Sequence, residues 1–85
     1  MAIVCVHGPL RKLAGGAELT LAGDSVLALL QAAEREHPAL AGWVLDERGL
    51  IRRHINVFVN GELGGLDTPV DERDRVEVLP AISGG

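Results

Sequence analysis

The sequence predicts an α+β fold, in which a mixed sheet of four to five strands packs around one main helix in a single small domain. Its 85 residues allow one modest hydrophobic core and leave no room for a second lobe. Runs with the two-residue apolar period of strands stand before and after one segment with the 3.6-residue period of a helix. A hairpin, a helix and further strands in that order are typical of an α+β domain.

Two strands are expected before the helix. Residues 2–7 (AIVCVH) are apolar on both faces, which is typical of a strand that is buried on most sides. Gly8-Pro9 ends this run, and a long loop leads to residues 17–23 (AELTLAG), where leucines alternate with polar residues as in a half-buried strand. The two strands are predicted to form an amino-terminal β-hairpin.

The main helix is predicted to begin after Asp24, which stands where an N-cap belongs. The apolar residues that follow are spaced i, i+3, i+4 and i+7 and form one stripe, made of Val26, Leu29, Leu30 and Ala33. Pro38 ends the helix, because it disfavours helical geometry at the residue before it. A short helical turn is expected within residues 39–50, and its core-facing side chains are Leu40, Trp43 and Val44.

Three strands are expected after the helix. In residues 54–63 (HINVFVNGEL), one isoleucine and two valines share one face of a strand, and the turn pair Asn60-Gly61 leads into a short second strand. Residues 64–74 contain many turn residues and read as a loop. Residues 75–81 (RVEVLPA) form the last strand, with its two valines facing the core and Leu79 facing outward.

This order of elements fits the β-grasp layout, in which a mixed sheet curls around a helix. If the last strand is central, the chain divides into a domain of residues 1–79 and a flexible tail of residues 80–85. Pro80 stiffens the start of this tail, and Gly84-Gly85 forms a narrow tip. Residues without a Cβ let the tail enter a tight channel, where a partner enzyme can use ATP to convert the terminal carboxylate into an acyl-adenylate. A sulfur or nitrogen nucleophile then attacks the adenylate carbonyl.

The composition argues against several classes of function. A net charge of −4 leaves no basic surface for binding nucleic acid. No apolar stretch approaches the roughly 20 residues of a membrane span, and no signal sequence opens the chain, so a cytoplasmic protein without membrane contact is expected. The single cysteine excludes an internal disulfide framework.

The polar residues form no catalytic or metal-binding pattern. Cys5 lies within a strand and is expected to be a small buried apolar residue. His7, His37 and His54 are widely spaced and have no cysteine companions, so no metal site is expected. The chain is therefore predicted to be a protein cosubstrate rather than an enzyme, with no bound cofactor of its own and with ATP used by its partner.

Several segments resemble the ubiquitin-like sulfur carriers, the family that includes the small subunit of molybdopterin synthase and the carriers of the thiamine and cysteine pathways. The segments are INVFVNGE (residues 55–62), GGLDTPV (64–70) and DRVEVLPAISGG (74–85), and the resemblance covers most of the chain. It implies that an E1-like enzyme adenylates Gly85, that a thiocarboxylate forms there, and that an acceptor enzyme takes the sulfur. Gly84, which has no side chain, then leaves the approach to the reacting terminus narrow. The residues that connect it to the domain are expected to contact the partner: Pro80, Ala81, Ile82 and Ser83.

Within that family the sequence looks closest to the cysteine-pathway carriers (the CysO type). Their acceptor is implied to be a pyridoxal-phosphate enzyme, and some relatives serve the synthesis of sulfur-containing secondary metabolites. The chain departs from the family at Glu72-Arg73-Asp74, where an acidic-Gly-Asp turn is frequent, and in a shortened loop after Glu62. Three alternatives stay open: a molybdopterin synthase small subunit, a protein modifier that forms isopeptide bonds through the same activated glycine, and a plain β-grasp interaction domain.

An apolar partner-binding patch is predicted beside the root of the tail. Phe58 and Leu79 point outward if the strand valines face the core, and Leu63 follows the tight turn. The resemblance adds that an apolar patch at similar positions of the molybdopterin synthase small subunit docks the activating enzyme, so Leu63 and Leu79 are the main expected contacts. The alternative is that residues 39–44 (ALAGWV) cover these side chains.

Overall fold

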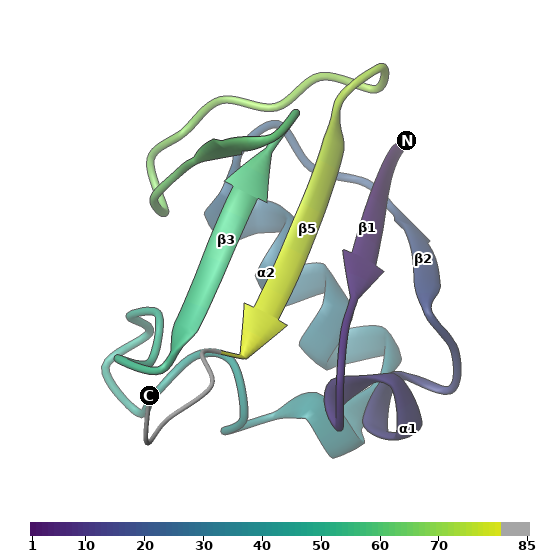
Figure 1. The fold of residues 1–85 in the computed structure, drawn as a ribbon, viewed down its shortest axis with the longest axis vertical. Coiled ribbons are helices and arrows are strands. Elements are labelled where there is room, and N and C mark those ends of the chain that lie inside the picture. Colours follow the sequence, from purple (N-terminus) through teal and green to yellow (C-terminus); the bar gives the residue numbers. More distant parts are fainter. Residues whose placement is uncertain (81–85) are drawn as a thin grey trace.

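The computed structural model describes residues 1–80 and confirms the predicted α+β, β-grasp architecture (Figure 1). Its elements in chain order are β1 (Ala2–Val6), α1 (Leu10–Ala14), β2 (Glu18–Leu21), α2 (Val26–Glu36), the 3₁₀ helix η1 (Pro38–Leu40), β3 (Ile55–Val59), β4 (Glu62–Leu63) and β5 (Arg75–Pro80). None of the helices described in residues 1–80 combines the length and the hydropathy that a membrane-spanning helix requires.

The sheet has five strands in the order β2-β1-β5-β3-β4, which puts the last strand of the chain in the middle. β5 pairs in parallel with β1, where Val4 lies opposite Val76, and antiparallel with β3, where Val57 lies opposite Val78. The outer pairs, β1 with β2 and β3 with β4, are antiparallel. The predicted amino-terminal hairpin and the central position of the last strand are therefore confirmed.

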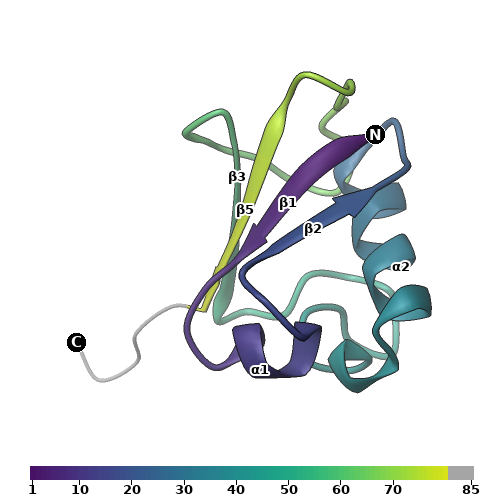
Figure 2. The ribbon, with the colours of Figure 1, turned by 90° about the vertical axis from the view of Figure 1, so that its right-hand side faces the viewer.

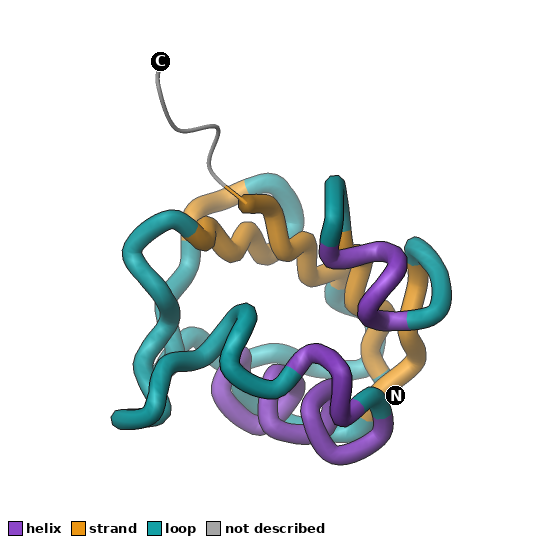
Figure 3. The backbone as a smooth tube through the Cα atoms, turned by 90° about the horizontal axis from the view of Figure 1, so that it is seen from below, coloured by secondary structure: helices purple, strands orange, loops and turns teal. Residues whose placement is uncertain are grey.

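The hydrophobic core lies between one face of the sheet and α2. Figure 3 shows the strands in one layer and α2 in a second layer, with loops along their margins. The largest side chains that are less than 2% exposed come from both layers and from η1: Val4, Leu21, Val26, Leu29, Leu40, Val57, Val76 and Val78. The predicted apolar stripe of α2 is confirmed, since all four of its residues are buried. No helix of the described residues covers the opposite face of the sheet (Figure 2).

Replacing Leu29 by alanine is expected to lower the free energy of unfolding by about 2–5 kcal/mol, because its side chain is fully buried between α2 and the sheet. Urea denaturation measures the change. Leu63→Ala is the matched control: it removes the same atoms from a side chain that is 70% exposed, so its effect stays within about 0.5 kcal/mol. Equal losses in the two variants would contradict this assignment of the core.

Helix α2 is capped by Ser25 rather than by the predicted Asp24. The Ser25 Oγ accepts a hydrogen bond from the Ala28 backbone N–H at 3.1 Å. The Asp24 carbonyl instead accepts a hydrogen bond from the Val70 N–H, at 3.0 Å. Both residue types are good N-caps, and the pairing of the distant loop with Asp24 decides which of them caps the helix. The helix ends before the proline that follows it, as predicted.

Helix α1 lies in a segment that the sequence analysis assigned to a loop, and that assignment is wrong. The helix has five residues, of which Leu10 and Ala14 are buried. It follows Pro9 and ends at Gly15, whose φ of +75° is a left-handed conformation that glycine adopts readily. A single helical turn contains too few apolar positions to reveal a period, which explains the error.

Trp43 does not pack into the core as predicted. Leu40 and Val44 are buried, as expected, and η1 supplies the expected helical turn, but the Trp43 side chain is 53% exposed. Leu45 is buried together with Val44, so these smaller side chains fill the available core volume. The largest apolar side chain of the segment is left at the surface.

Candidate functional site

The central strand β5 carries the root of the predicted tail. Its last residues pair with β3, Leu79 opposite Asn56 and Pro80 opposite Ile55, so the strand includes Pro80, the residue at which the predicted tail begins. On the other side, the His7 N–H donates a hydrogen bond to the Val78 carbonyl at 3.2 Å. The sheet therefore holds the root of the tail from both sides.

Five of the predicted site residues lie outside the described residues. They are Ala81, Ile82, Ser83, Gly84 and Gly85, and the role of each stays a prediction. The predicted site residues within residues 1–80 are Phe58, Leu63, Leu79 and Pro80, and each can be placed on the sheet.

Phe58, Leu63 and Leu79 share the sheet face that α2 leaves open. Phe58 lies directly opposite Leu63 across the β3–β4 pair and opposite Glu77 across the β3–β5 pair, two residues before Leu79. Leu63 is 70% exposed, whereas Phe58 and Leu79 are half-buried. Residues 39–44 were the alternative cover for these side chains, but Leu40 and Val44 of that segment pack in the hydrophobic core. We call Phe58, Leu63 and Leu79 the open-face patch; its role in binding stays a prediction.

Polar groups border the open-face patch on the side of β1. His7 Nε2 lies 3.4 Å from Glu77 Oε1, and the guanidinium Nη2 of Arg75 lies 3.9 Å from Glu18 Oε2. Cys5 lies between the two glutamates in the sheet register and is buried, as predicted. Burial raises the pKa of the Cys5 thiol, which favours the unreactive protonated form. The described part of this face thus offers contacts rather than a nucleophile.

Pro80 faces the opposite side of the sheet from Leu79 and lines a small apolar cleft of about 160 Å³. Its lining residues are Pro9, Leu10, Trp43, His54, Ile55 and Pro80. Gly8 packs against Pro80, because a Cβ added to Gly8 would lie only 3.2 Å from the Pro80 Cγ. Its φ of +62° is also a left-handed conformation that favours glycine. Neither Trp43 nor His54 was predicted to lie beside the root of the tail, and Trp43 was expected in the core. The one available signal was that Trp43 is the only tryptophan in the chain.

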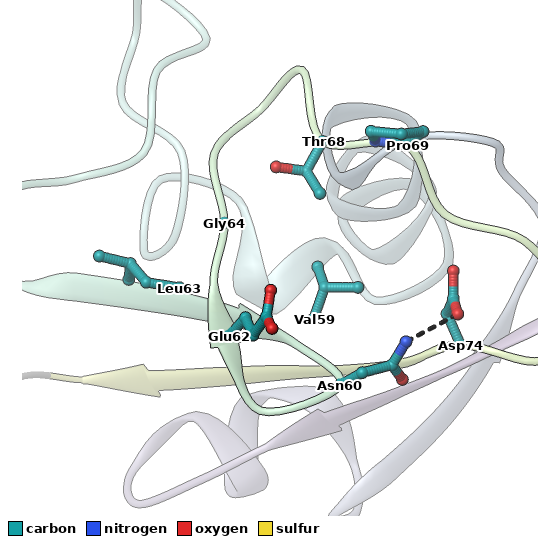
Figure 4. A pocket seen from close by; sticks show the side chains of 8 residues that line it. All are labelled: Val59, Asn60, Glu62, Leu63, Gly64, Thr68, Pro69 and Asp74. Carbon is teal, nitrogen blue, oxygen red and sulfur yellow. Dashed lines mark hydrogen bonds between the residues drawn. The ribbon is translucent and has the colours of Figure 1, made fainter.

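A more polar cavity of about 320 Å³ lies at the other end of β5 (Figure 4). Asn60 donates a hydrogen bond from Nδ2 to Asp74 Oδ1 at 2.8 Å and accepts one from the Arg75 N–H at 2.9 Å. Hydrogen bonds from the Asp71 N–H and from Asn60 lower the pKa of Asp74. Asn60 and Gly61 have φ values of +53° and +85°, which confirms the predicted tight turn. The hydrogen bonds of Asn60 thus connect the turn at Asn60-Gly61 to the start of β5.

This polar cavity is remote from the tail. Asp74 immediately precedes β5, and the six residues of that strand separate it from the root of the tail by roughly 20 Å, at about 3.3 Å per residue. Among the residues that the structure describes, no group of three His, Cys, Asp or Glu side chains is placed to hold a metal ion. The described residues thus place the open-face patch on one side of the end of β5 and the apolar cleft at Pro80 on the other.

Comparisons with known proteins agree with this arrangement. The model of the ThiS family matches residues 4–85. The sulfur carrier protein CysO of Mycobacterium tuberculosis is 31% identical over 83 residues, which cover 89% of each chain. The small archaeal modifier protein 3 of Haloferax volcanii is 36% identical over 61 residues, which cover 67% of this chain and 65%, less than two thirds, of that protein.

A solved structure extends the likeness to the whole described fold. The crystal structure of an Amycolatopsis orientalis BexX/CysO complex contains a chain that matches this one with a TM-score of 0.88 and 31% identity, over 100% of both chains. The relatives that match over most of this chain are thus small carrier and modifier proteins with the same ubiquitin-like fold. The family match over residues 4–85 and the identity to CysO over 89% of the chain together show that this chain belongs to the ThiS family.

Proposed function

We propose that this chain is a sulfur carrier, whose Gly85 carboxylate is adenylated, converted to a thiocarboxylate and used as a sulfur donor. The observation that carries the proposal is the position of β5: the central strand ends at Pro80 and is followed in the sequence by AISGG. The likeness to CysO over 89% of both chains supports it. The chain acts as a protein cosubstrate, in the cytoplasm, and contributes no catalytic side chain.

The chemistry takes place at the terminal carbonyl. In an E1-like enzyme that binds ATP, a Gly85 carboxylate oxygen attacks the α-phosphorus, pyrophosphate leaves, and an acyl-adenylate forms. A sulfide ion, HS⁻, then attacks the carbonyl carbon, AMP leaves, and one proton is released. Neither Gly84 nor Gly85 has a Cβ that would block the narrow approach to this carbonyl. The product is a thiocarboxylate at Gly85.

The acceptor of the sulfur is a synthase that builds a carbon–sulfur bond. We place this chain with a pyridoxal-phosphate-dependent cysteine synthase or with a synthase that forms a sulfur-containing secondary metabolite. The likeness to the CysO chain of the BexX/CysO complex supports direct docking of the carrier onto such a partner. The open-face patch, beside the root of the tail, is the surface that we assign to the activating enzyme.

The test is the intact mass of the chain after incubation with an E1-like enzyme from the same genome, ATP and sulfide. The expected result is a mass increase equal to the difference between sulfur and oxygen, confined to the C-terminal peptide. A sample without ATP is the control and keeps its mass. An unchanged mass with each E1-like enzyme of the genome would overturn the proposal.

A protein modifier is the second candidate, because the small archaeal modifier protein 3 is 36% identical over 61 residues. A modifier uses the same acyl-adenylate, but the nucleophile is ultimately a lysine amine of a target protein, and an isopeptide bond forms. Cell extracts separate the two functions. Lysine-linked conjugates that end in Gly85, together with no thiocarboxylate, would favour the modifier.

A further inference from the structure

A second surface meets the root of the tail on the side opposite the open-face patch. Trp43 and His54 line both the apolar cleft of about 160 Å³ at Pro80 and a cavity of about 290 Å³ that they share with Gly42 and Arg52. The two hollows therefore adjoin across Trp43. We call the surface made of Trp43, Arg52, His54 and Pro80 the Trp43 face. Arg53, which is exposed, lies between two of these residues in the sequence and is counted with this surface.

The backbone beneath Trp43 is held in place by several hydrogen bonds. The Trp43 N–H donates to the Leu40 carbonyl at 2.9 Å, and the Arg52 N–H donates to the Val44 carbonyl at 2.9 Å. The Arg52 Nε also donates to the carbonyl of Gly42. Leu40 and Val44 are buried, so the segment is anchored on both sides of the tryptophan. A large apolar side chain is thus presented to solvent on a fixed support, a combination typical of contact residues.

The charges of the Trp43 face are free to meet a partner. Neither Arg52 nor Arg53 forms an ion pair with any residue from 1 to 80, and Arg53 is exposed. The nearby Asp46 is engaged by Arg48, whose side chain lies 2.8 Å away and whose hydrogen bonds lower the pKa of Asp46 to about 2. In a chain with net charge −4, the tail end thus carries two guanidinium groups that pair with no carboxylate of residues 1–80.

The opposite end of β5 is acidic. Asp71, Glu72 and Asp74 lie just before that strand, and Glu62 pairs with Val59 beside its first residues. These four acidic side chains outnumber the two arginines of the same stretch, Arg73 and Arg75. A molecule that is negative at one end and has unpaired arginines at the other turns its tail end towards a negative surface, because charge complementarity orients an encounter. The charge distribution thus favours an acidic partner at the tail.

The length of the tail brings any enzyme that acts on Gly85 close to this face. Gly85 lies five residues after Pro80, and five extended residues span at most about 18 Å, at roughly 3.3–3.6 Å each. A channel that encloses the terminal carboxylate therefore has its mouth near Pro80. Leu79 and Pro80 face opposite sides of the sheet, so the mouth meets the open-face patch on one side and the Trp43 face on the other.

We propose that the Trp43 face is a second docking surface, which receives an acidic rim of the enzyme that adenylates the tail. Carboxylates of that rim pair with Arg52 and Arg53, and an apolar side chain enters the cleft between Trp43 and Pro80. This inference rests on the proposed function, because it requires that an enzyme enclose Gly85. It adds the charge of the partner's rim and a contact surface that lies apart from the open-face patch.

The experiment compares two double variants with equal changes in charge. R52E/R53E reverses the charge of the Trp43 face, and R35E/R73E reverses two exposed arginines on α2 and before β5. ATP–pyrophosphate exchange by the E1-like enzyme of the same genome is measured against carrier concentration. We expect the KM for R52E/R53E to rise at least about 10-fold with kcat unchanged, and the KM for R35E/R73E to stay within about 2-fold. Added salt screens the charges, so it should reduce the difference in KM between R52E/R53E and the unaltered chain.

Trp43→Ala tests the apolar part of the face separately. Its side chain is half exposed, so the fold should persist, as circular dichroism will verify, while the KM rises. An unchanged KM in both R52E/R53E and Trp43→Ala, with the unaltered chain fully activated, would overturn this inference alone. Equal rises in KM for the two double variants would also overturn it, since net charge would then explain the effect. Failure of the unaltered chain to be activated would overturn the proposed function and this inference with it.

Discussion

Deletion of Gly85 is expected to abolish formation of the thiocarboxylate and to leave the domain folded. The enzyme channel that accepts two residues without a Cβ would receive Ser83-Gly84 instead, with the carboxylate one residue short of the reacting position. The core and all the strand pairs of the described structure lie within residues 2–80, so the free energy of unfolding should change by less than about 0.5 kcal/mol. Intact mass after activation and urea denaturation measure the two effects.

Gly85→Ala is the matched control for the deletion, since it keeps the length and the carboxylate and adds only a methyl group. Activation should be reduced but detectable, because the added Cβ crowds the carbonyl without moving it out of reach. If the deletion variant still acquires sulfur at Gly84, activation does not depend on the length of the tail, and the prediction is wrong. A deletion variant that unfolds would contradict the division between the domain and the tail.

Replacing Leu79 by glutamate is expected to weaken binding to the E1-like enzyme by at least about 2 kcal/mol, or about 30-fold in Kd. The side chain is half-buried on the open face beside the root of the tail, and a carboxylate there would be desolvated in a complex without a partner. The loss of folding stability should stay near 1 kcal/mol, because Leu79 lies outside the core cluster. Isothermal titration calorimetry and urea denaturation separate the two effects.

Ile3→Glu is the matched control on the same face. Ile3 is 38% exposed and lies opposite Arg75, at the end of β5 away from the tail. The Ile3→Glu substitution introduces the same charge and should leave the Kd for the E1-like enzyme within about 2-fold of its original value. Parallel losses of binding and stability in Leu79→Glu would assign Leu79 to the core, and equal weakening by both variants would point to charge alone.

The main elements were predictable because the spacing of apolar residues along the sequence indicates which face of each element is buried. The two-residue period predicted β2, β3 and β5, and the 3.6-residue period predicted α2, since each of these elements buries one face over several residues. A run that is apolar on both faces predicted β1. The pair Asn60-Gly61 marked its turn because two successive positive φ values favour these residue types. Helix α1 escaped prediction because one turn has no measurable period.

Other features depended on contacts between segments that are distant in the sequence. Asp24 and Ser25 are both suitable caps, and the hydrogen bond from Val70 to the Asp24 carbonyl, across more than forty residues of chain, accompanies the choice of Ser25. Trp43 was expected inside because it is large and apolar. It lies outside because Val44 and Leu45 already occupy the space between α2 and the sheet.

The sequence by itself determined the fold class, the family and a Gly-Gly ending after a strand, because local periodicity and family motifs are carried by consecutive residues. Only the tertiary structure decided what surrounds the root of that ending. The order β2-β1-β5-β3-β4 puts Leu79 beside Phe58 and Leu63 on one face, and Pro80 beside Trp43 and His54 on the other. These residues come from three separate stretches of chain, around residues 43, 54–63 and 79–80. Their proximity depends on non-local pairing, for which the spacing of residues along the sequence has no signal.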